Sequence, residues 1–333
     1  MSESLGILVT GGCGFVGRNA VDALADRGDR VVALDLVGEP WREDVAVVHA
    51  DLRDRSAIER HFVGQDVVIH AASLVRTRQT RSQDVWAVNL TGTEHVLGAC
   101  RAHGVGRLVY LSSASVVYEG RDIEGGTEDL PYARVSQAAY ADSKIAAERL
   151  VLAANDAELA TCAIRPHVVF GPGDRRLLPA ILERARAGKL RHRVGSGNHL
   201  SDFTYISNLV DALLAACDRL RVNSPVAGQA YFVTNGEPMG FFDFVERVLV
   251  QLELPVPDKR VPYAVAYAAA AVAEAWEAIR GGPPGAEDGM SRFAVRYLCT
   301  HHWFQIDKAR TDLGYVPEVS IEQGITATVA ALP

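Results

Sequence analysis

A glycine-rich turn near the start of the chain constrains its fold more than any other feature. The apolar run at residues 5–10 has the character of a buried strand, and residues 16–26 carry apolar side chains at helical spacing. Between them, the run TGGCGFVG places Gly11, Gly14 and Gly17 where the strand would turn into the helix. Such a turn lets backbone N–H groups approach a pyrophosphate, and the helix N-terminus adds a positive dipole end. The turn therefore predicts a sheet that binds a dinucleotide.

The first two thirds of the chain alternate short apolar runs with helical patterns, which is typical of parallel strands joined by crossover helices. We expect strands at residues 6–10, 30–35, 45–49, 67–70, 107–112 and 161–165. We expect the helices between them at residues 16–26, 55–63, 85–103 and 139–154. The predicted fold class is α/β, a Rossmann-type doubly wound parallel sheet with a smaller C-terminal substrate-binding lobe.

The pattern loosens after residue 165. We expect helices at 177–187, 205–219, 240–252, 304–313 and 321–331, a short strand at 230–234, and a Gly- and Pro-rich break at 281–289. This predicts a dinucleotide-binding domain over 1–170. Residues 171–333 would form mainly the substrate lobe, with some segments returning to the sheet.

Charge and cysteine content exclude several classes of function. The net charge is −7 and no Lys/Arg-rich run occurs, so we expect no nucleic-acid partner. The five cysteines are far apart and form no CxxC, which argues against a metal centre or a disulfide framework and suits a reducing cytoplasm. We see no signal peptide and expect a cytoplasmic protein.

Residues 261–279 form a strongly apolar segment of about the length of a membrane span. The segment is rich in alanine and contains Glu274 and Glu277. We therefore expect a helix packed on or near the substrate lobe. A peripheral membrane contact is the alternative interpretation.

Asp35 ends the second predicted strand. A carboxylate at this place accepts hydrogen bonds from both ribose hydroxyls and repels a 2'-phosphate, which predicts NAD rather than NADP. Asp51 and Leu52 follow the third strand, where the adenine would lie. The alternative for Asp51 is an ordinary loop residue, because Asp is common in loops.

Tyr140 and Lys144 begin a predicted helix in the run YADSK. A spacing of four places both side chains on one face. A tyrosine has an ordinary pKa of about 10, and a neighbouring ammonium together with a positively charged nicotinamide favours the phenolate. The phenolate can then accept the proton of a secondary alcohol while hydride leaves its carbon.

Three serines, Ser112, Ser113 and Ser115, follow the fifth predicted strand. Ligands of open α/β sheets bind at the carboxyl ends of the strands, so a hydroxyl there can hold the reacting oxygen. We choose Ser113 for this role and Ser112 as the second choice. The alternative is a serine that only caps a turn.

These motifs together, TGGCGFVG, HAAS, SSASVVY and YADSK, resemble the extended short-chain dehydrogenase/reductase family. Longer stretches such as AIRPHVVFGPGD and DFTYISN look like its 3β-hydroxysteroid dehydrogenase branch, especially sterol-4α-carboxylate 3-dehydrogenases. The C-terminal run CTHHWFQIDKARTDLGYVPEVSIEQGI looks more like bacterial enzymes that act on long-chain β-keto or β-hydroxy acids in olefin biosynthesis.

The resemblance implies catalysis by Ser113, Tyr140 and Lys144, with support from Asn89. It also implies a homodimer built through the helices at 85–103 and 140–154. The expected substrate is hydrophobic, a sterol or steroid oxidised at its 3β-hydroxyl with decarboxylation of a 4-carboxysterol to follow, or a long-chain β-hydroxy or β-keto acid. The residues expected to contact NAD are Gly11, Gly14, Phe15, Val16, Gly17, Asp35, Asp51, Leu52, Ala71, Ala72, Ser112, Tyr140, Lys144, Pro166, His167 and Val168.

Two other functions are open to this family. Nucleotide-sugar epimerases and dehydratases tend to carry an Asn in an RxxNxYG-like stretch, whereas this chain reads RPHVVFG, and an acidic pair beside the serine is missing. Non-catalytic NAD-binding regulators usually lack the Tyr or the Lys, and both are present here. The reading as an oxidoreductase is therefore favoured over both alternatives.

Substrate contacts are less defined by the sequence than the cofactor site. Arg175, Arg176 and Arg193 are candidate partners for a substrate carboxylate, and a solvated surface position is the alternative for each. His167 is either a polar pocket residue or a structural histidine. The long loop at 119–135 is a candidate lid, or a plain surface excursion.

Overall fold

A computed structural model describes residues 4–75, 83–135, 138–280 and 291–332. The main sheet has seven strands in the order β12-β7-β5-β4-β1-β2-β3, and every pair in it is parallel. The predicted α/β class and doubly wound sheet are confirmed. The strands are β1 (Gly6–Thr10), β2 (Arg30–Asp35), β3 (Ala46–His49), β4 (Val67–His70), β5 (Arg107–Leu111), β7 (Ala160–Pro166) and β12 (Ala230–Val233).

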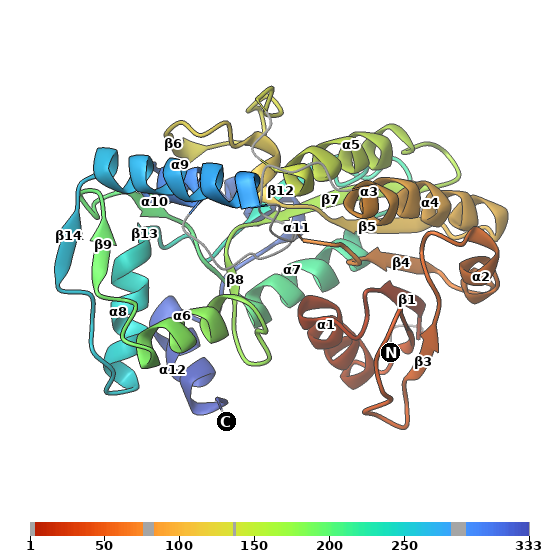
Figure 1. Cartoon of the computed structure of the whole chain (residues 1–333). Helices are drawn as coiled ribbons and strands as arrows, with labels where there is room; N and C mark the ends of the chain where they lie inside the picture. Colours follow the sequence, from red (N-terminus) through yellow and green to blue (C-terminus); the bar gives the residue numbers. More distant parts are fainter. Residues whose placement is uncertain (1–3, 76–82, 136–137, 281–290, 333) are drawn as a thin grey trace.

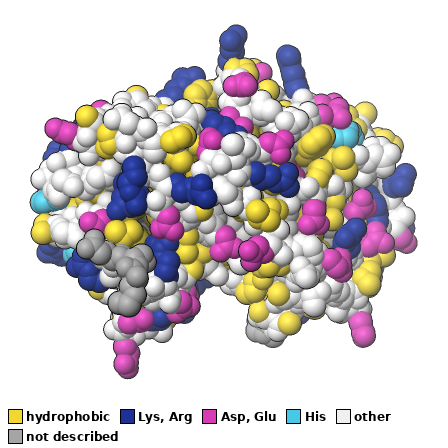
Figure 2. All heavy atoms as spheres, turned by 180° about the vertical axis from the view of Figure 1, so that it is seen from behind, with side chains coloured by type: hydrophobic (Ala, Val, Ile, Leu, Met, Phe, Trp, Pro, Cys, Tyr) yellow, Lys and Arg dark blue, Asp and Glu magenta, His cyan; other side chains and the backbone are white. Residues whose placement is uncertain are grey.

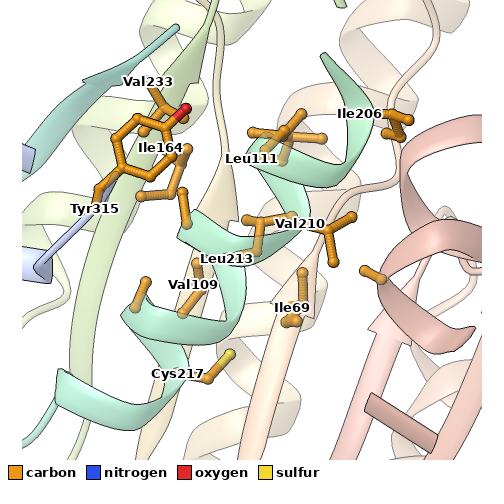
Figure 3. Packing of buried hydrophobic residues seen from close by; sticks show 14 of the residues in the cluster. Ile69, Val109, Leu111, Ile164, Ile206, Val210, Leu213, Cys217, Val233 and Tyr315 are labelled. Carbon is orange, nitrogen blue, oxygen red and sulfur yellow. The ribbon is translucent and has the colours of Figure 1, made fainter. Parts of the chain in front are cut away.

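Helices cover both faces of this sheet (Figure 1), which is why its central strands are apolar without alternation. On one face lie α1 (Phe15–Asp26) and α7 (Ile206–Arg219). Figure 3 shows Val210, Leu213 and Cys217 of α7 over the strand residues Ile69 and Val109. The other face packs against α2 (Arg55–Glu59), α4 (Gly92–Ala102) and α5 (Ala139–Ala153).

The predicted helix over 85–103 is interrupted in the structure. It consists of α3 (Gln83–Trp86), a π-helical turn η2 (Ala87–Thr91) and then α4. The short 3-10 helix η1 (Arg60–Phe62) extends α2. A second one, η3 (Ala114–Val117), follows β5. The π turn is an extra-wide turn of the kind found at functional sites, and it places Asn89 beside α5.

The C-terminal part of the chain adds β12 to the main sheet. A small four-stranded sheet joins β13, β10, β15 and β6, and two strand pairs, β11–β8 and β14–β9, lie beside it. These strands are β6 (Ile123–Gly126), β8 (Val169–Phe170), β9 (His192–Val194), β10 (Leu200–Ser201), β11 (Thr204–Tyr205), β13 (Met239–Gly240), β14 (Lys259–Val261) and β15 (His302–Phe304). The helices are α6 (Leu177–Arg186), α8 (Phe241–Gln251), α9 (Tyr263–Arg280), α10 (Arg292–Leu298), α11 (Asp307–Leu313) and α12 (Ile321–Ala330).

Two expectations for segments of the small sheet need correction. The helix predicted over 304–313 begins only at Asp307, because His302–Phe304 pairs as β15 with β6 and β10. The candidate lid at 119–135 contains β6, which is tied to β15 and is therefore part of the small sheet. The predicted break at 281–289 lies outside the described residues.

The apolar segment at 261–279 begins at the end of β14 and from Tyr263 onward forms helix α9, which packs on α10. Among the helices that the structure describes, none has the length and hydrophobicity needed to cross a membrane. Lys/Arg and Asp/Glu side chains are interspersed over the face of the molecule shown in Figure 2.

Candidate active site

The glycine turn closes tightly against two neighbouring strands. Gly11 has a φ of +69°, and a Cβ added to it would lie 2.7 Å from the backbone of Ala72 at the end of β4. A Cβ on Gly17 would overlap the carbonyl oxygen of Gly11. Gly14 caps α1, so Phe15 and Val16 open the helix whose free N–H groups point out of the turn. The turn thus has the cradle that a pyrophosphate needs.

Asp35 lies at the end of β2, beside this turn. Its carboxylate accepts hydrogen bonds from the backbone N–H groups of Cys13 (3.0 Å) and Leu36 (2.7 Å). Each oxygen keeps lone pairs for further donors. The carboxylate is therefore held in one position, and its contact with ribose hydroxyls stays a prediction.

The residues that follow β4 pack against the glycine turn. Ala71 N donates to Thr10 O (3.1 Å), which brings the Ala71–Ala72 backbone against the glycine turn. His70 is buried between the hydroxyls of Thr10 (2.6 Å) and Thr93 (2.9 Å), and burial lowers its pKa to about 3. His70 is thus a neutral structural residue.

The predicted adenine contacts lie after β3. Leu52 is buried and accepts a hydrogen bond at its carbonyl oxygen from the His95 ring (2.8 Å). Asp51 pairs with Arg53 (2.7 Å), and that hydrogen bond lowers its pKa. The contact of Asp51 and Leu52 with adenine stays a prediction.

The catalytic pair predicted from sequence lies on the inner face of α5. Lys144 is almost fully buried, and its Nζ donates to Leu111 O at the end of β5 (2.6 Å). Burial lowers the pKa of Lys144 to about 7, against the opposing effect of Glu148. Lys144 is therefore held in one place with its charge poorly solvated, so a nearby anion gains strongly from it.

Tyr140 stands one turn before Lys144, partly exposed. Burial raises its pKa, while a hydrogen bond from Ser113 and the positive charge of Arg176 lower it. Ser113 caps η3, and its Oγ accepts from Ser115 N (3.2 Å). Tyr140, Lys144 and Ser113 thus converge at the carboxyl ends of the strands, which is where the sequence places the chemistry.

Ser112 has a different neighbour from Ser113. Its hydroxyl donates a short hydrogen bond to the fully buried carboxylate of Glu148, so the second-choice donor is occupied within the protein. Glu148 also forms an ion pair with Arg165 on β7 (2.6 Å) and accepts from Tyr132 (2.8 Å). Glu148 was missed by sequence reasoning. Its position four residues after Lys144, on the same helical face, is the signal that identifies it.

Asn89 braces the start of α5 from the π turn. Its Nδ2 donates to Ser143 Oγ (2.9 Å), and Ser143 in turn donates to the carbonyl oxygen of Tyr140 (2.8 Å). Its Oδ1 accepts from Leu74 N (2.7 Å). Asn89 therefore links the loop after β4 to the turn that carries Tyr140.

The segment after β7 contains the remaining residues that the sequence predicts to contact NAD. Pro166 is the last residue of β7, and His167 follows it, buried. Val168 has a φ of +29°, a backbone strain that is rare for a β-branched residue and is concentrated at functional sites. His167 contacts His302 (2.8 Å) and the Tyr297 hydroxyl (3.2 Å), two residues that the sequence analysis did not select.

The three arginines that are candidates for binding a substrate carboxylate have different neighbours. Arg193 pairs with Asp243 (3.2 Å) and Glu246, so it ties β9 to α8. Arg175 acts electrostatically on Cys13 in the glycine turn. Arg176 acts on Tyr140 and donates to Val75 O (3.1 Å), so it is the member of the set that lies near the catalytic tyrosine.

Comparison with known proteins gives a consistent result. The model of the 3-beta hydroxysteroid dehydrogenase/isomerase family matches residues 8–263. The chain is 41% identical to the 2-alkyl-3-oxoalkanoate reductase of Stenotrophomonas maltophilia, covering 96% of this chain and 97% of that protein. It is 34% identical to the decarboxylating sterol-4-alpha-carboxylate 3-dehydrogenase of Mus musculus, covering 99% and 91%.

A similar solved structure is that of MoeE5 in complex with UDP-glucuronic acid and NAD. It has a TM-score of 0.75 at 25% identity and covers 98% of each chain. The predicted cofactor, NAD, is supported by this match, and the glycine cradle and the fixed Asp35 carboxylate fit it.

Proposed function

Since the chain belongs to the 3-beta hydroxysteroid dehydrogenase/isomerase family and is an NAD-dependent oxidoreductase, we propose that its substrate is a β-hydroxy or β-keto acid on a bulky apolar molecule. A sterol with a 3-hydroxyl and a 4-carboxylate is a β-hydroxy acid. A 2-alkyl-3-oxoalkanoate is a β-keto acid. The two named relatives thus share one reacting unit, a secondary carbon–oxygen centre with a carboxylate two carbons away.

The observation that supports this proposal is that Ser113, Tyr140 and Lys144 meet at the carboxyl edge of the parallel sheet, the edge at which the glycine turn follows β1. NAD supplies the hydride acceptor or donor. Ser113 donates a hydrogen bond to the reacting oxygen. Tyr140 accepts the alcohol proton during oxidation and returns it during reduction, and the buried ammonium of Lys144 stabilises the phenolate.

The balance of the reaction is simple. In the oxidation the alcohol would give a hydride to bound NAD and its proton to Tyr140, which would leave a ketone. A β-keto acid formed in this way can lose carbon dioxide without a further catalytic group. The chain therefore needs a hydride-transfer site and a place for the carboxylate, with no separate decarboxylation machinery.

A substrate panel tests the proposal. Purified protein is mixed with NAD and a 3β-hydroxysteroid, its 4-carboxylate, a 2-alkyl-3-hydroxy acid or a UDP-sugar, and NADH is followed by absorbance. We expect NADH with a β-hydroxy acid. Activity confined to the UDP-sugar would overturn the proposal in favour of nucleotide-sugar chemistry, and NAD binding without any turnover would favour a regulator.

The higher identity to the alkanoate reductase, 41% against 34%, supports the alkyl acid as a substrate alongside the sterol. The panel separates the two by kcat/KM. A higher kcat/KM for the 4-carboxysterol supports a sterol as the preferred substrate. A higher kcat/KM for the 2-alkyl acid supports an alkyl acid as the preferred substrate.

We also infer a homodimer in which α4 and α5, which pack side by side, meet their copies in the partner. Sedimentation velocity measures the mass of the particle. A dimer that dissociates when Ala146 on α5 is changed to Arg supports this interface. A monomer at all concentrations contradicts it.

We further infer that α9 rests on a lipid surface. Val265, Val272 and Trp276 lie on one helical face and are 58%, 70% and 55% exposed. An apolar face of this kind binds at the boundary between headgroups and acyl chains. Val272→Asp should reduce sedimentation with vesicles, whereas Val316→Asp, at another exposed valine, should not. Equal binding of the two variants would contradict the inference.

A further inference from the structure

Two histidines from distant parts of the chain are in contact where the chain leaves β7. His167 follows β7, and His302 opens β15, 135 residues later. His167 Nε2 and His302 Nδ1 are 2.8 Å apart, and both side chains are buried. Hydride transfer by Ser113, Tyr140 and Lys144 has no need of them, so their function is not explained by that chemistry.

The backbone fixes the proton positions in this pair. His302 Nε2 lies 2.8 Å from the carbonyl oxygen of Tyr297, which can only accept, so His302 carries its hydrogen on Nε2. In a neutral pair, His302 Nδ1 is then an acceptor and His167 Nε2 is the donor to it. Nδ1 of His167 is left with a lone pair.

The hydroxyl of Tyr297 is the hydrogen-bond donor that lies close to that lone pair. It lies 3.3 Å from His167 Nδ1 and 3.2 Å from Nε2, whose hydrogen is already directed at His302. Hence Tyr297 donates to His167 while the pair is neutral. The Tyr297 ring is held by stacking on His302 (4.0 Å between centroids) and by an edge contact with Tyr118 (5.3 Å).

Tyr297 on α10 also lies near the segment that carries Ser113. Its ring makes the edge contact with Tyr118, which ends η3, and Ser113 caps the start of that short helix. Burial raises the pKa of Tyr297, and Tyr118 and Tyr140 add to that rise. Tyr297 is therefore a polar group available to a neighbouring substituent of a substrate held by Ser113 and Tyr140. In a β-hydroxy acid that substituent is the carboxylate.

The surroundings of the pair hold no counter-charge among the described groups that act on it. His167 is packed against Thr204, Phe304, Tyr297 and His302, and His302 is influenced by His301 and His199. The neighbouring carboxyl of Asp202 is directed to Phe304 N (2.7 Å), and burial raises its pKa to about 7. Burial lowers the pKa of His302 to about 4 and that of His167 well below its usual value.

We propose that Tyr297 and the His167–His302 pair form the subsite for the substrate carboxylate, and that the pair takes up one proton from solvent as the acid binds. This inference rests on the proposed function. With a proton on Nδ1, His167 donates to both His302 and the Tyr297 oxygen. The Tyr297 hydrogen then turns to the carboxylate, which supplies the negative charge that the buried imidazolium lacks.

Calorimetry tests this without turnover. A 2-alkyl-3-hydroxy acid and its methyl ester are titrated into the wild-type NADH complex, in buffers of different ionisation enthalpy. We expect uptake of close to one proton with the acid and none with the ester. Equal proton exchange for the two ligands would overturn the proposal.

Variants locate the subsite. Tyr297→Phe and His302→Asn should weaken acid binding by about tenfold or more, the loss of a charge-assisted hydrogen bond, with a smaller effect on the ester. His302→Asn should also abolish the proton uptake. Tyr118→Phe is the control, because the Tyr118 hydroxyl is held by Thr300 (2.7 Å). A selective loss of acid binding in Arg176→Gln, with none in Tyr297→Phe, would assign the carboxylate to Arg176 instead.

The outcomes also separate the two proposals. Selective, proton-linked acid binding without NADH formation would contradict the proposed function and leave the subsite standing. Oxidation of the acid and the ester with equal KM in wild type and Tyr297→Phe would support the proposed function and overturn the subsite.

Discussion

Lys144 Nζ donates a 2.6 Å hydrogen bond to the carbonyl oxygen of Leu111, which joins helix α5 to the end of β5 directly before the serine run. The bond sets the distance between the two elements that carry Tyr140 and Ser113. An ammonium held in this way needs no rearrangement to stabilise a phenolate, which is the condition for efficient electrostatic catalysis.

Replacement of the base should stop chemistry while cofactor binding persists. We expect Tyr140→Phe to lower the rate of NADH formation by roughly a hundredfold to ten-thousandfold, the usual contribution of a general base. Fluorescence titration with NADH should give a dissociation constant close to that of the wild type. Near-normal turnover in this variant would reject Tyr140 as the base.

The cofactor-free protein should show a pH-dependent stability that originates in Lys144. Its pKa is about 7 when folded and near its usual higher value when unfolded, so the unfolded state binds more protons between these values. This group therefore adds stability as pH rises above 7 and removes it as pH falls to 7, by at most about 1.4 kcal/mol per pH unit. Denaturant unfolding at pH 7 to 9.5 measures the slope. Lys144→Met should lose this part of it, and equal slopes in the two proteins would contradict the assignment.

The glycine cradle should not tolerate a methyl group. Gly17→Ala places a Cβ onto the Gly11 carbonyl oxygen, so the turn must open and NAD binding should fall strongly. Gly106→Ala is the matched control, since a Cβ there meets nothing within 4 Å. Calorimetric titration with NAD compares the two. Equal affinities would show that the turn does not hold the pyrophosphate.

The buried pair of Glu148 and Arg165 should behave as a unit. Glu148→Leu leaves the Arg165 guanidinium, which is 4% exposed, without its carboxylate, and we expect a loss of about 3–5 kcal/mol in the free energy of unfolding. The double variant Glu148→Leu, Arg165→Met should recover much of this loss. Additive effects of the single changes would mean that the two side chains are not coupled.

The sequence predicted the parts of the site that depend on neighbours in the chain. The glycine spacing, Asp35 at a strand end and the Tyr140–Lys144 spacing each follow from local geometry, and the structure has the strands and helices that they require. The boundaries of the main-sheet strands and of α1 and α5 agree to within a residue for the same reason.

Contacts between segments that are far apart in the chain could not be predicted from local sequence patterns. His302 lies in β15, which the sequence did not predict, because a helix was expected from residue 304 onward. The strands that pair with β15, β6 and β10, come from earlier parts of the chain. The hydrogen bond between Ser112 and Glu148 also escaped detection, because strand β5 and helix α5 meet only in the folded molecule.

The sequence by itself determined the fold class and predicted the cofactor turn and the tyrosine and lysine proposed for catalysis, because each is encoded by residue type and spacing over a few positions. Only the tertiary structure decided which serine is committed to Glu148, which arginine lies near Tyr140, and that Tyr297 meets His167. These depend on packing between segments more than a hundred residues apart or on opposite sides of a crossover, where the burial of side chains, and no local rule, sets the neighbours.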